Sequence, residues 1–186
     1  MTKYYKVLNG LSPIYGQPTP WKVGKWMPEI EGDLVACKNG YHLCAGYSQL
    51  LEWLGPNIYI AEWRGDKIDA GDKIVVRQAR IVKQLKTWNK RTKRLFAADC
   101  AERVLHIYER YYPGDSRVRD VIEISRKVAR GELPASGLTA AATAAWAAEA
   151  AGAAGDAARA ADWAAGDAEK KWQAKRLSEY LTGKRQ

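Results

Sequence analysis

An alanine-rich tract near the C-terminus constrains the fold of this chain more than any other feature. Between positions 135 and 168, 19 of 34 residues are alanine. Alanine has the highest helix propensity but buries little apolar surface, and burial stabilises by roughly 25 cal/mol per Å². The tract is therefore expected to form thin helices that pack closely against a neighbouring element. Gly152, Gly155 and Gly166 interrupt it, and they mark either close helix crossings or a break into two helices.

The first half of the chain has the opposite composition. Residues 1–95 are rich in aromatic side chains and carry 16 Lys and Arg against 8 Asp and Glu, which is +8 of the total net charge of +9. A field of this sign attracts phosphates, acidic proteins or acidic membranes without specifying the partner. The positive charge therefore belongs mainly to the N-terminal part of the chain.

Cysteine usage and hydropathy indicate the compartment. The chain has three cysteines, and an odd number in a chain of this size is not a disulfide framework. The N-terminus has no apolar signal-peptide core, and no run approaches the roughly 18 apolar residues of a membrane span. We expect a cytoplasmic protein with no membrane association.

Strands and one short helix are expected in the first half. An Asn39-Gly40 turn between short apolar runs predicts a β-hairpin. The other elements are predicted from alternation and from turn residues: strands over 3–9, 58–63 and 73–85, the hairpin strands 34–37 and 41–44, a helix over 48–54, and a long loop over 12–26.

The second half is expected to be helical. Apolar spacing predicts one helix over residues 95–112, and Asp115 is the expected N-cap of the next, which ends at Gly131. The alanine-rich helix or helices then run to about Leu181. The predicted fold class is α+β: a small β-rich domain over residues 1–94, followed by an all-α, Ala-rich helical bundle over residues 95–186.

Charged residues on the first two helices predict an interhelical ion network. One cluster follows Ala97-Ala98 and the other begins the second helix: Asp99, Glu102 and Arg103, and Arg117, Arg119 and Asp120. In the alanine-rich tract, Asp156, Arg159 and Asp162 repeat this pattern and are expected to fix helix register.

A basic run supplies the first candidate binding residues. Residues 77–94 contain eight Lys or Arg in eighteen positions and no acidic residue. A cationic run with an interleaved aromatic residue suits phosphate contact and stacking on a base, and a solvated strand face is the alternative. The predicted ligand-binding residues of this run are Arg77, Arg80, Lys83 and Trp88.

Aromatic loop residues and one histidine complete the predicted cleft. Trp21 and Trp26 lie in the proline-rich loop, where they can stack on a ligand ring. His42 lies between Cys37 and Cys44, but zinc requires four ligands and a second close pair is missing. We therefore predict no metal site, no cofactor and no catalytic residue, with Trp21, Trp26 and His42 in ligand contact.

Two stretches resemble known families. The first comprises Phe96-Ala-Ala-Asp-Cys-Ala-Glu-Arg-Val-Leu, the segment 112–119 (Tyr-Pro-Gly-Asp-Ser-Arg-Val-Arg) and the closing segment 172–181. It is similar to a family of immunity proteins from bacterial polymorphic toxin systems. This resemblance covers about residues 95–182 and implies an all-helical protein that acts by binding.

The N-terminal half resembles an uncharacterised domain of phage and bacterial genomes. The residues concerned are the opening Tyr-Lys strand, the segment Cys37-Lys-Asn-Gly-Tyr-His-Leu-Cys, and a strand that ends near Gly65. A looser resemblance to ADP-ribosyltransferase-like folds implies a split sheet with a nucleotide-sized cleft. The first-strand Arg or His and the late catalytic acid of such enzymes cannot be assigned in this chain.

Three hypotheses of function follow. The favoured one is a non-enzymatic binding protein, encoded by a phage or mobile element, that neutralises a toxin or host-defence component by stoichiometric capture. Its target is an anionic nucleotide-like molecule or a protein, with nucleic acid less favoured. The alternatives are a nucleotide-processing enzyme that uses His42, and a helical assembly protein. We also expect a homo-oligomer formed through the alanine-rich helices, which is compatible with the first hypothesis.

Overall fold

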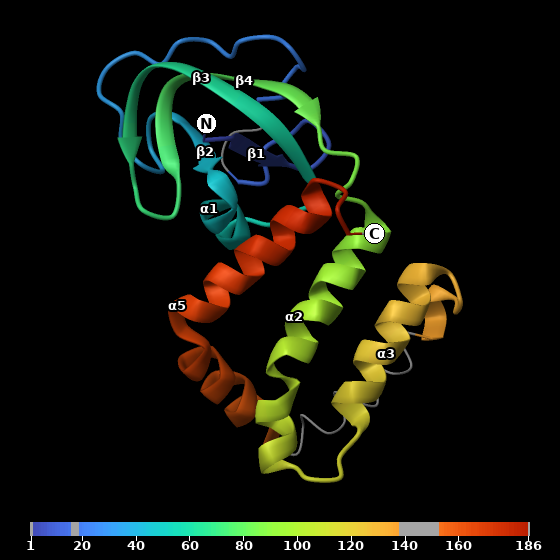
Figure 1. The fold of residues 1–186 in the computed structure, drawn as a ribbon. Coiled ribbons are helices and arrows are strands. Elements are labelled where there is room, and N and C mark those ends of the chain that lie inside the picture. The colour runs from blue at the N-terminus through green and yellow to red at the C-terminus, as the bar shows by residue number, and fades with distance from the viewer. Residues whose placement is uncertain (1, 16–18, 138–152, 186) are drawn as a thin grey trace. The chain divides into compact units, whose positions relative to one another are not determined.

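The computed structural model describes residues 2–15, 19–137 and 153–185, the segment 153–165 by its backbone alone. The chain divides into two compact units, Met1–Trp88 and Asn89–Gln186. The first unit contains strands and a short helix, and the second contains helices (Figure 1). The mixed α+β class predicted from the sequence is therefore confirmed.

Four antiparallel strands close into a small barrel in the first unit. They are β1 (Tyr4–Leu8), β2 (Tyr41–Ala45), β3 (Asn57–Asp69) and β4 (Ile74–Gln84). The order around the barrel is β1-β2-β4-β3, and β3 pairs with β1 to close it. Helix α1 (Gly46–Glu52) follows β2 directly. This closed barrel does not support the split sheet that the ADP-ribosyltransferase resemblance implied.

Apolar side chains fill the interior of the barrel. Core positions on β3 and within each half of β4 are two residues apart (59 and 61; 74 and 76; 79 and 81), because successive strand side chains point to opposite faces. Full burial of each large side chain contributes roughly 1.5–3 kcal/mol. The buried residues of this cluster are Leu8, Trp21, Met27, Leu43, Tyr59, Ala61, Ile74, Val76, Ala79 and Ile81.

A non-strand segment, residues 24–30, extends the barrel wall beside β4. The backbone N–H groups of Met27 and Ile30 donate to the carbonyl groups of Ala79 and Arg77 at 2.9 and 3.1 Å. β2 pairs with β4 only from position 74 to 76, so this segment satisfies backbone groups further along the same strand. The segment thereby acquires a fixed position on the barrel.

The predicted hairpin across Asn39-Gly40 is wrong. Residues 34–37 form no strand, and Val35 pairs with Asn39 only through an isolated bridge. The Asn39 side-chain amide donates to the carbonyl groups of Glu31 and Asp33 at 2.8 and 2.9 Å, which stabilises the preceding loop. The turn signal was correct, but distant strands supply the partners of β2.

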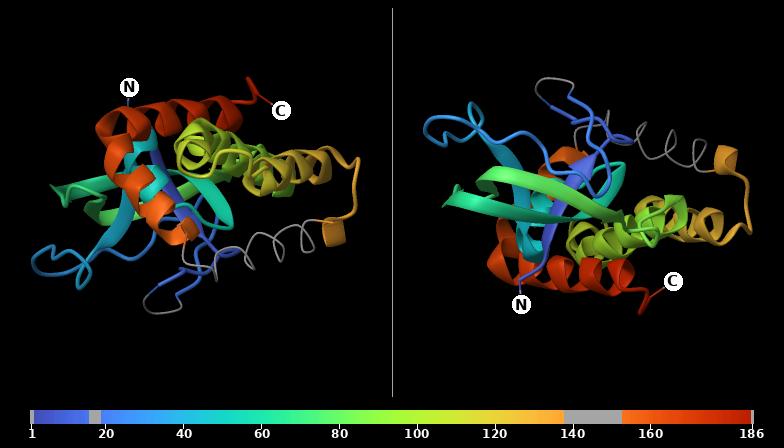
Figure 2. Two further views of the ribbon diagram at one scale, coloured as in Figure 1. Left: turned by 90° about the horizontal axis from the view of Figure 1, so that it is seen from below. Right: turned by 90° about the horizontal axis from the view of Figure 1, so that it is seen from above.

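Helices α2 (Lys90–Tyr111) and α3 (Arg117–Arg130) lie side by side in the second unit (Figures 1 and 2). α2 begins earlier than predicted because Asn89 caps it: Oδ1 accepts from the backbone N–H of Thr92 at 3.2 Å, and the Thr92 hydroxyl accepts from the Asn89 N–H at 3.0 Å. α3 ends at Gly131, in the left-handed conformation (φ 79°), as predicted.

The C-terminal helix α5 (Ala153–Leu181) bends at Gly166, whose backbone (φ 40°, ψ −156°) is not helical. The change of direction is visible in Figures 1 and 2. Of the alternatives left open by the sequence, Gly166 therefore divides the helix. Gly152 lies outside the described residues, as do the side chains of Asp156, Arg159 and Asp162.

Candidate functional site

The face of β3 that points away from the barrel core carries polar side chains. Ala61 is buried in the core and Trp63 packs against it. Strand alternation therefore places Glu62 and Arg64 on the outer surface, where both are exposed. Strand geometry thus separates candidate binding residues from core residues that are adjacent in sequence.

β4 aligns further polar side chains with these two. Across the β3–β4 pair, Glu62 lies opposite Arg80 and Arg64 lies opposite Gln78. Arg80 contacts Glu62 Oε2 through Nε at 2.7 Å and through Nη2 at 2.5 Å. Arg64 Nε donates to Gln78 Oε1 at 2.5 Å. The outer surface is therefore a paired network that holds both arginines in defined positions.

Trp26, on the segment that extends the barrel wall, contacts both arginines. The guanidinium carbons of Arg64 and Arg80 lie 4.4 and 4.7 Å from the centroid of the Trp26 ring, within cation–π range. The neighbouring Met27 is buried in the core, which anchors the segment. Lys83 of β4 pairs with Ile60, two residues before Glu62 on β3, across a register shift between Ile60 and Ala61. We call this surface the arginine–tryptophan face and define it by Trp26, Glu62, Arg64, Gln78, Arg80 and Lys83.

The arginine–tryptophan face brings together three of the predicted binding residues, Trp26, Arg80 and Lys83. Their role as ligand contacts stays a prediction. Arg64 was missed because it precedes the basic run in sequence. Period-two alternation from Ala61 would have placed it beside Glu62 on the outer face.

Arg77 has a structural role in the first unit. Its Nη1 donates to the carbonyl groups of Ile30 and Gly32 at 2.6 and 3.0 Å, and its Nε donates to Asp66 at 2.8 Å. These contacts attach the loop before β2 to the barrel. The guanidinium is thus already engaged by protein groups.

Trp21 and Trp88 are buried, with 2% and 6% of their surface exposed. Trp21 packs edge to face against Tyr41, with ring centroids 5.6 Å apart, and Trp88 Nε1 donates to the carbonyl of Gly55 at 2.9 Å. Neither ring is positioned to stack on an external ligand, so the predicted stacking role of these two residues is not supported.

His42 holds a turn. Its Nε2 accepts a hydrogen bond from the backbone N–H of Cys37 at 3.1 Å, and Cys37 itself has positive φ (64°). Burial lowers the pKa of His42, and the positive charges of Lys6 and Lys73 lower it further. The imidazole is therefore neutral at pH 7 and serves as an acceptor. It lies on β2, which contributes no residue to the arginine–tryptophan face.

Lys6 lies where the β1–β2 ladder ends, after the pair Tyr5 and Cys44. Its Nζ donates to the carbonyl of His42 at 3.0 Å and lies 5.2 Å from the centroid of the Trp21 ring. Burial lowers the pKa of Lys6 to about 8. The Lys6 side chain thus lies at the point where β1 and β2 stop pairing.

Pairing of a cation with a tryptophan recurs elsewhere in the chain. Lys73 and Lys67 lie over Trp53 and Trp63, at 4.5 and 5.5 Å from the ring centroids. Trp172 of α5 contacts two more guanidinium groups. The sequence predicts a ligand site from its many basic and aromatic residues. Many of these residues instead form cation–π contacts with one another within the protein.

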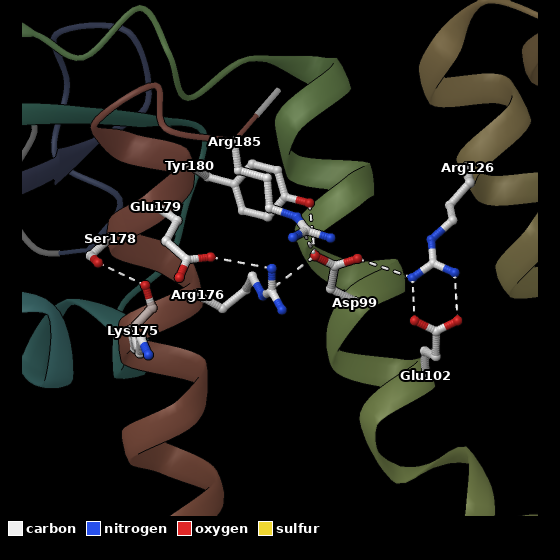
Figure 3. A network of polar contacts seen from close by, with 9 residues as sticks. All are labelled: Asp99, Glu102, Arg126, Lys175, Arg176, Ser178, Glu179, Tyr180 and Arg185. Carbon is white, nitrogen blue, oxygen red and sulfur yellow. Dashed lines mark hydrogen bonds and ion pairs between the residues drawn. The ribbon is translucent and has the colours of Figure 1, made fainter.

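The second unit is organised around the buried carboxylate of Asp99 (Figure 3). Arg126 of α3 lies 3.0 Å from Oδ1, and Arg176 and Arg185 lie 3.6 and 3.2 Å from Oδ2. Tyr180 donates to Oδ2 at 2.9 Å. One carboxylate thus links α2, α3, α5 and the segment after α5.

The interhelical ion network predicted from the sequence is present with different partners. Arg126 joins α3 to Asp99 and Glu102 of α2, and Arg119 pairs with Glu109. Arg117 pairs instead with Asp115 at the start of its own helix. The sequence indicated Asp99 and Glu102 correctly, but it did not indicate Arg126 as their partner or Glu109 as the partner of Arg119.

The residues that the structure describes show neither a metal centre nor a helix suited to cross a membrane. They contain no group of three or more His, Cys, Asp or Glu side chains arranged to hold a metal ion. None of the helices in these ranges has the length and apolar character needed to cross a bilayer.

Comparison with protein families assigns both halves of the chain. Residues 83–181 match the family described as "Imm-5 like putative immunity protein". The chain belongs to this Imm-5 like family. Residues 2–93 match a domain of unknown function, DUF7666. No curated protein and no solved structure has a significant match to the chain.

The family assignment confirms the resemblance of the C-terminal half to immunity proteins, and nothing supports the one to ADP-ribosyltransferases. An immunity-type protein acts by binding a toxin partner. Helices α2 and α3 lie within the residues matched to the immunity family, as does the Asp99 network apart from Arg185. The four barrel strands lie within the domain of unknown function.

Proposed function

We propose that this protein neutralises a toxin by forming a stoichiometric complex with it. The observation that carries this proposal is the Imm-5 like match over residues 83–181, which spans helices α2, α3 and α5 from end to end. Neutralisation by capture requires complementary surfaces rather than reactive groups, and it places the protein among binding proteins rather than enzymes.

The contacts of Asp99 support the view that the second unit of this chain is a rigid binding surface. Asp99 is 6% exposed and has three arginines and one tyrosine as partners, so its helices are joined by directional contacts. A pre-organised surface loses less conformational entropy on binding than a mobile one. Such a unit can present a fixed surface to a toxin.

A protein is the target that the structure favours over a nucleotide-like molecule. Of the residues predicted to contact a small anion, Trp21 and Trp88 are buried, and Arg77 is engaged by backbone carbonyls, which leaves fewer groups for a small ligand. Self-association through the alanine-rich helices, a cytoplasmic location and a phage or mobile-element origin stay predictions from the sequence.

A growth-rescue screen tests the proposed function. Growth-inhibitory open reading frames from the source genome are expressed singly in a host cell, with and without the full chain. We expect the chain to restore growth against one toxin and to co-purify with it as an equimolar complex. If the chain rescues no inhibitory reading frame of that genome, toxin neutralisation is contradicted.

A further inference from the structure

We propose that the arginine–tryptophan face of the first unit is a docking surface for an acidic protein surface. This inference rests on the proposed function in one respect, because it takes the toxin to be the protein that is bound. It goes beyond that function by assigning a binding role to the barrel, which belongs to a domain of unknown function.

The charge of the face is complementary to an acidic partner. Three cations, Arg64, Arg80 and Lys83, share the face with one carboxylate, Glu62. Arg64 and Lys83 are exposed, and the Arg80 side chain is 34% exposed. The first unit, residues 1–88, carries 12 Lys and Arg against 8 Asp and Glu, a net charge of +4, and a field of this sign accelerates association with acidic surfaces.

The cations of the face are held in place before binding. Glu62 fixes Arg80 through two contacts, Gln78 fixes Arg64, and Trp26 contacts both guanidinium groups. Gln78 is fixed in turn, since its Nε2 donates to the carbonyl of Met27 at 2.7 Å. Rigid arginines lose little side-chain entropy when they form bidentate contacts with carboxylates.

The composition of the face favours a protein over a nucleic acid. Tryptophan and arginine are enriched at the energetic centres of protein interfaces. The Trp26 ring is already in contact with two guanidinium groups, and Glu62 lies among the cations, where it repels a continuous line of phosphates. Separate carboxylates on a folded partner can contact Arg64 and Lys83 without approaching Glu62.

Binding of a fluorescent oligoglutamate peptide to the full chain tests this proposal without knowledge of the toxin. We expect salt-sensitive binding that the double variant Arg64→Glu/Lys83→Glu weakens at least about tenfold. The matched control is Lys3→Glu/Lys38→Glu, which changes the charge of the same unit equally at exposed positions off the face. The control should bind within about twofold of the parent protein.

Three outcomes would overturn the proposal. They are unchanged binding by Arg64→Glu/Lys83→Glu, an equal loss in the Lys3→Glu/Lys38→Glu control, and tighter binding of an oligouridylate of the same length than of oligoglutamate. Far-UV circular dichroism melts of both variants verify that they fold. The peptide result is independent of the growth-rescue screen, so a failure of the proposed function and a failure of the docking surface are distinguishable.

Discussion

Tyr180 donates a hydrogen bond to the Asp99 carboxylate at 2.9 Å across 81 positions of sequence. Both residues are almost fully buried, and the same carboxylate oxygen is approached by Arg176 and Arg185. A buried acid that satisfies groups from several segments stabilises the arrangement of those segments. Its removal leaves several cations without their shared partner.

Asp99→Asn should therefore destabilise the helical unit by about 3 kcal/mol, the usual cost of breaking a buried ion pair. Urea unfolding monitored by circular dichroism at the helix band measures this loss. Glu102→Gln is the matched control, because Glu102 contacts the same Arg126 but its side chain is 55% exposed. The control should cost less than about 1 kcal/mol. Equal effects of the two changes would refute the special role of Asp99.

Lys6→Met should stabilise the barrel at pH 7 by about 1–2 kcal/mol, because it removes a cation whose burial is costly. The pKa of Lys6 is about 8 in the folded state and 10.5 in its ordinary state. Between these values the unfolded chain binds the proton and the folded chain does not, so this group makes stability rise with pH over that window.

Below pH 8 the lysine is charged in both states, and the full burial cost applies. The free-energy advantage of Lys6→Met should accordingly shrink as the pH rises from 8 towards 10.5. Denaturant unfolding of both proteins across this range gives the difference directly. An advantage that stays constant or grows with pH would show that the Lys6 pKa is not lowered. Lys3→Met, at an exposed position of the same segment, serves as the reference.

Truncation of two loop tryptophans to alanine distinguishes a core residue, Trp21, from a residue of the outer face, Trp26. Trp21→Ala removes a 2% exposed ring from the barrel core and should cost about 3–5 kcal/mol. Trp26→Ala removes a half-buried ring and two cation–π contacts and should cost at most about 2 kcal/mol. Thermal and urea unfolding of the two variants give the comparison. A larger loss for Trp26→Ala would contradict its placement on the outer face.

Gly40→Ala should strongly destabilise the first unit. A Cβ atom at this position would lie 2.3 Å from Cγ1 of Val75, a fully buried side chain, and Gly40 has φ of +135°. We expect a loss above about 2 kcal/mol. Gly71→Ala is the control, because φ there is +84° but nothing lies within 4 Å, so only the backbone cost of about 1 kcal/mol applies. Similar melting temperatures for both variants would argue against the close Gly40–Val75 contact.

Local sequence patterns predicted most of the secondary structure. The segments that end at Gly10 and begin after the turn at residues 69–72 were predicted as strands, and they contain β1 and β4; Gly131 indicated the end of α3. The partner of β2 could not be predicted, because strand pairing depends on segments far apart in sequence. The Asn39-Gly40 signal fixed a turn but not which strands it connects.

The candidate site was predicted only in part, for the same reason. The basic run from Arg77 to Arg94 identified Arg80 and Lys83, but it could not show that Arg77 faces the carbonyl groups of the preceding loop. Arg64 joins the face through the β3–β4 register, a long-range property. The cluster of basic residues in the sequence therefore indicated the strand β4 of the arginine–tryptophan face, but only some of the side chains that form this face.

A titration of toxin activity tests the central claim of stoichiometric capture most directly. The toxin found by growth rescue is mixed with increasing amounts of the full chain, and its residual activity is measured at equilibrium. Capture predicts a linear fall to zero at one equivalent, unchanged by longer incubation. Progressive loss of all toxin activity at a small fraction of an equivalent would show turnover, and would contradict the binding account.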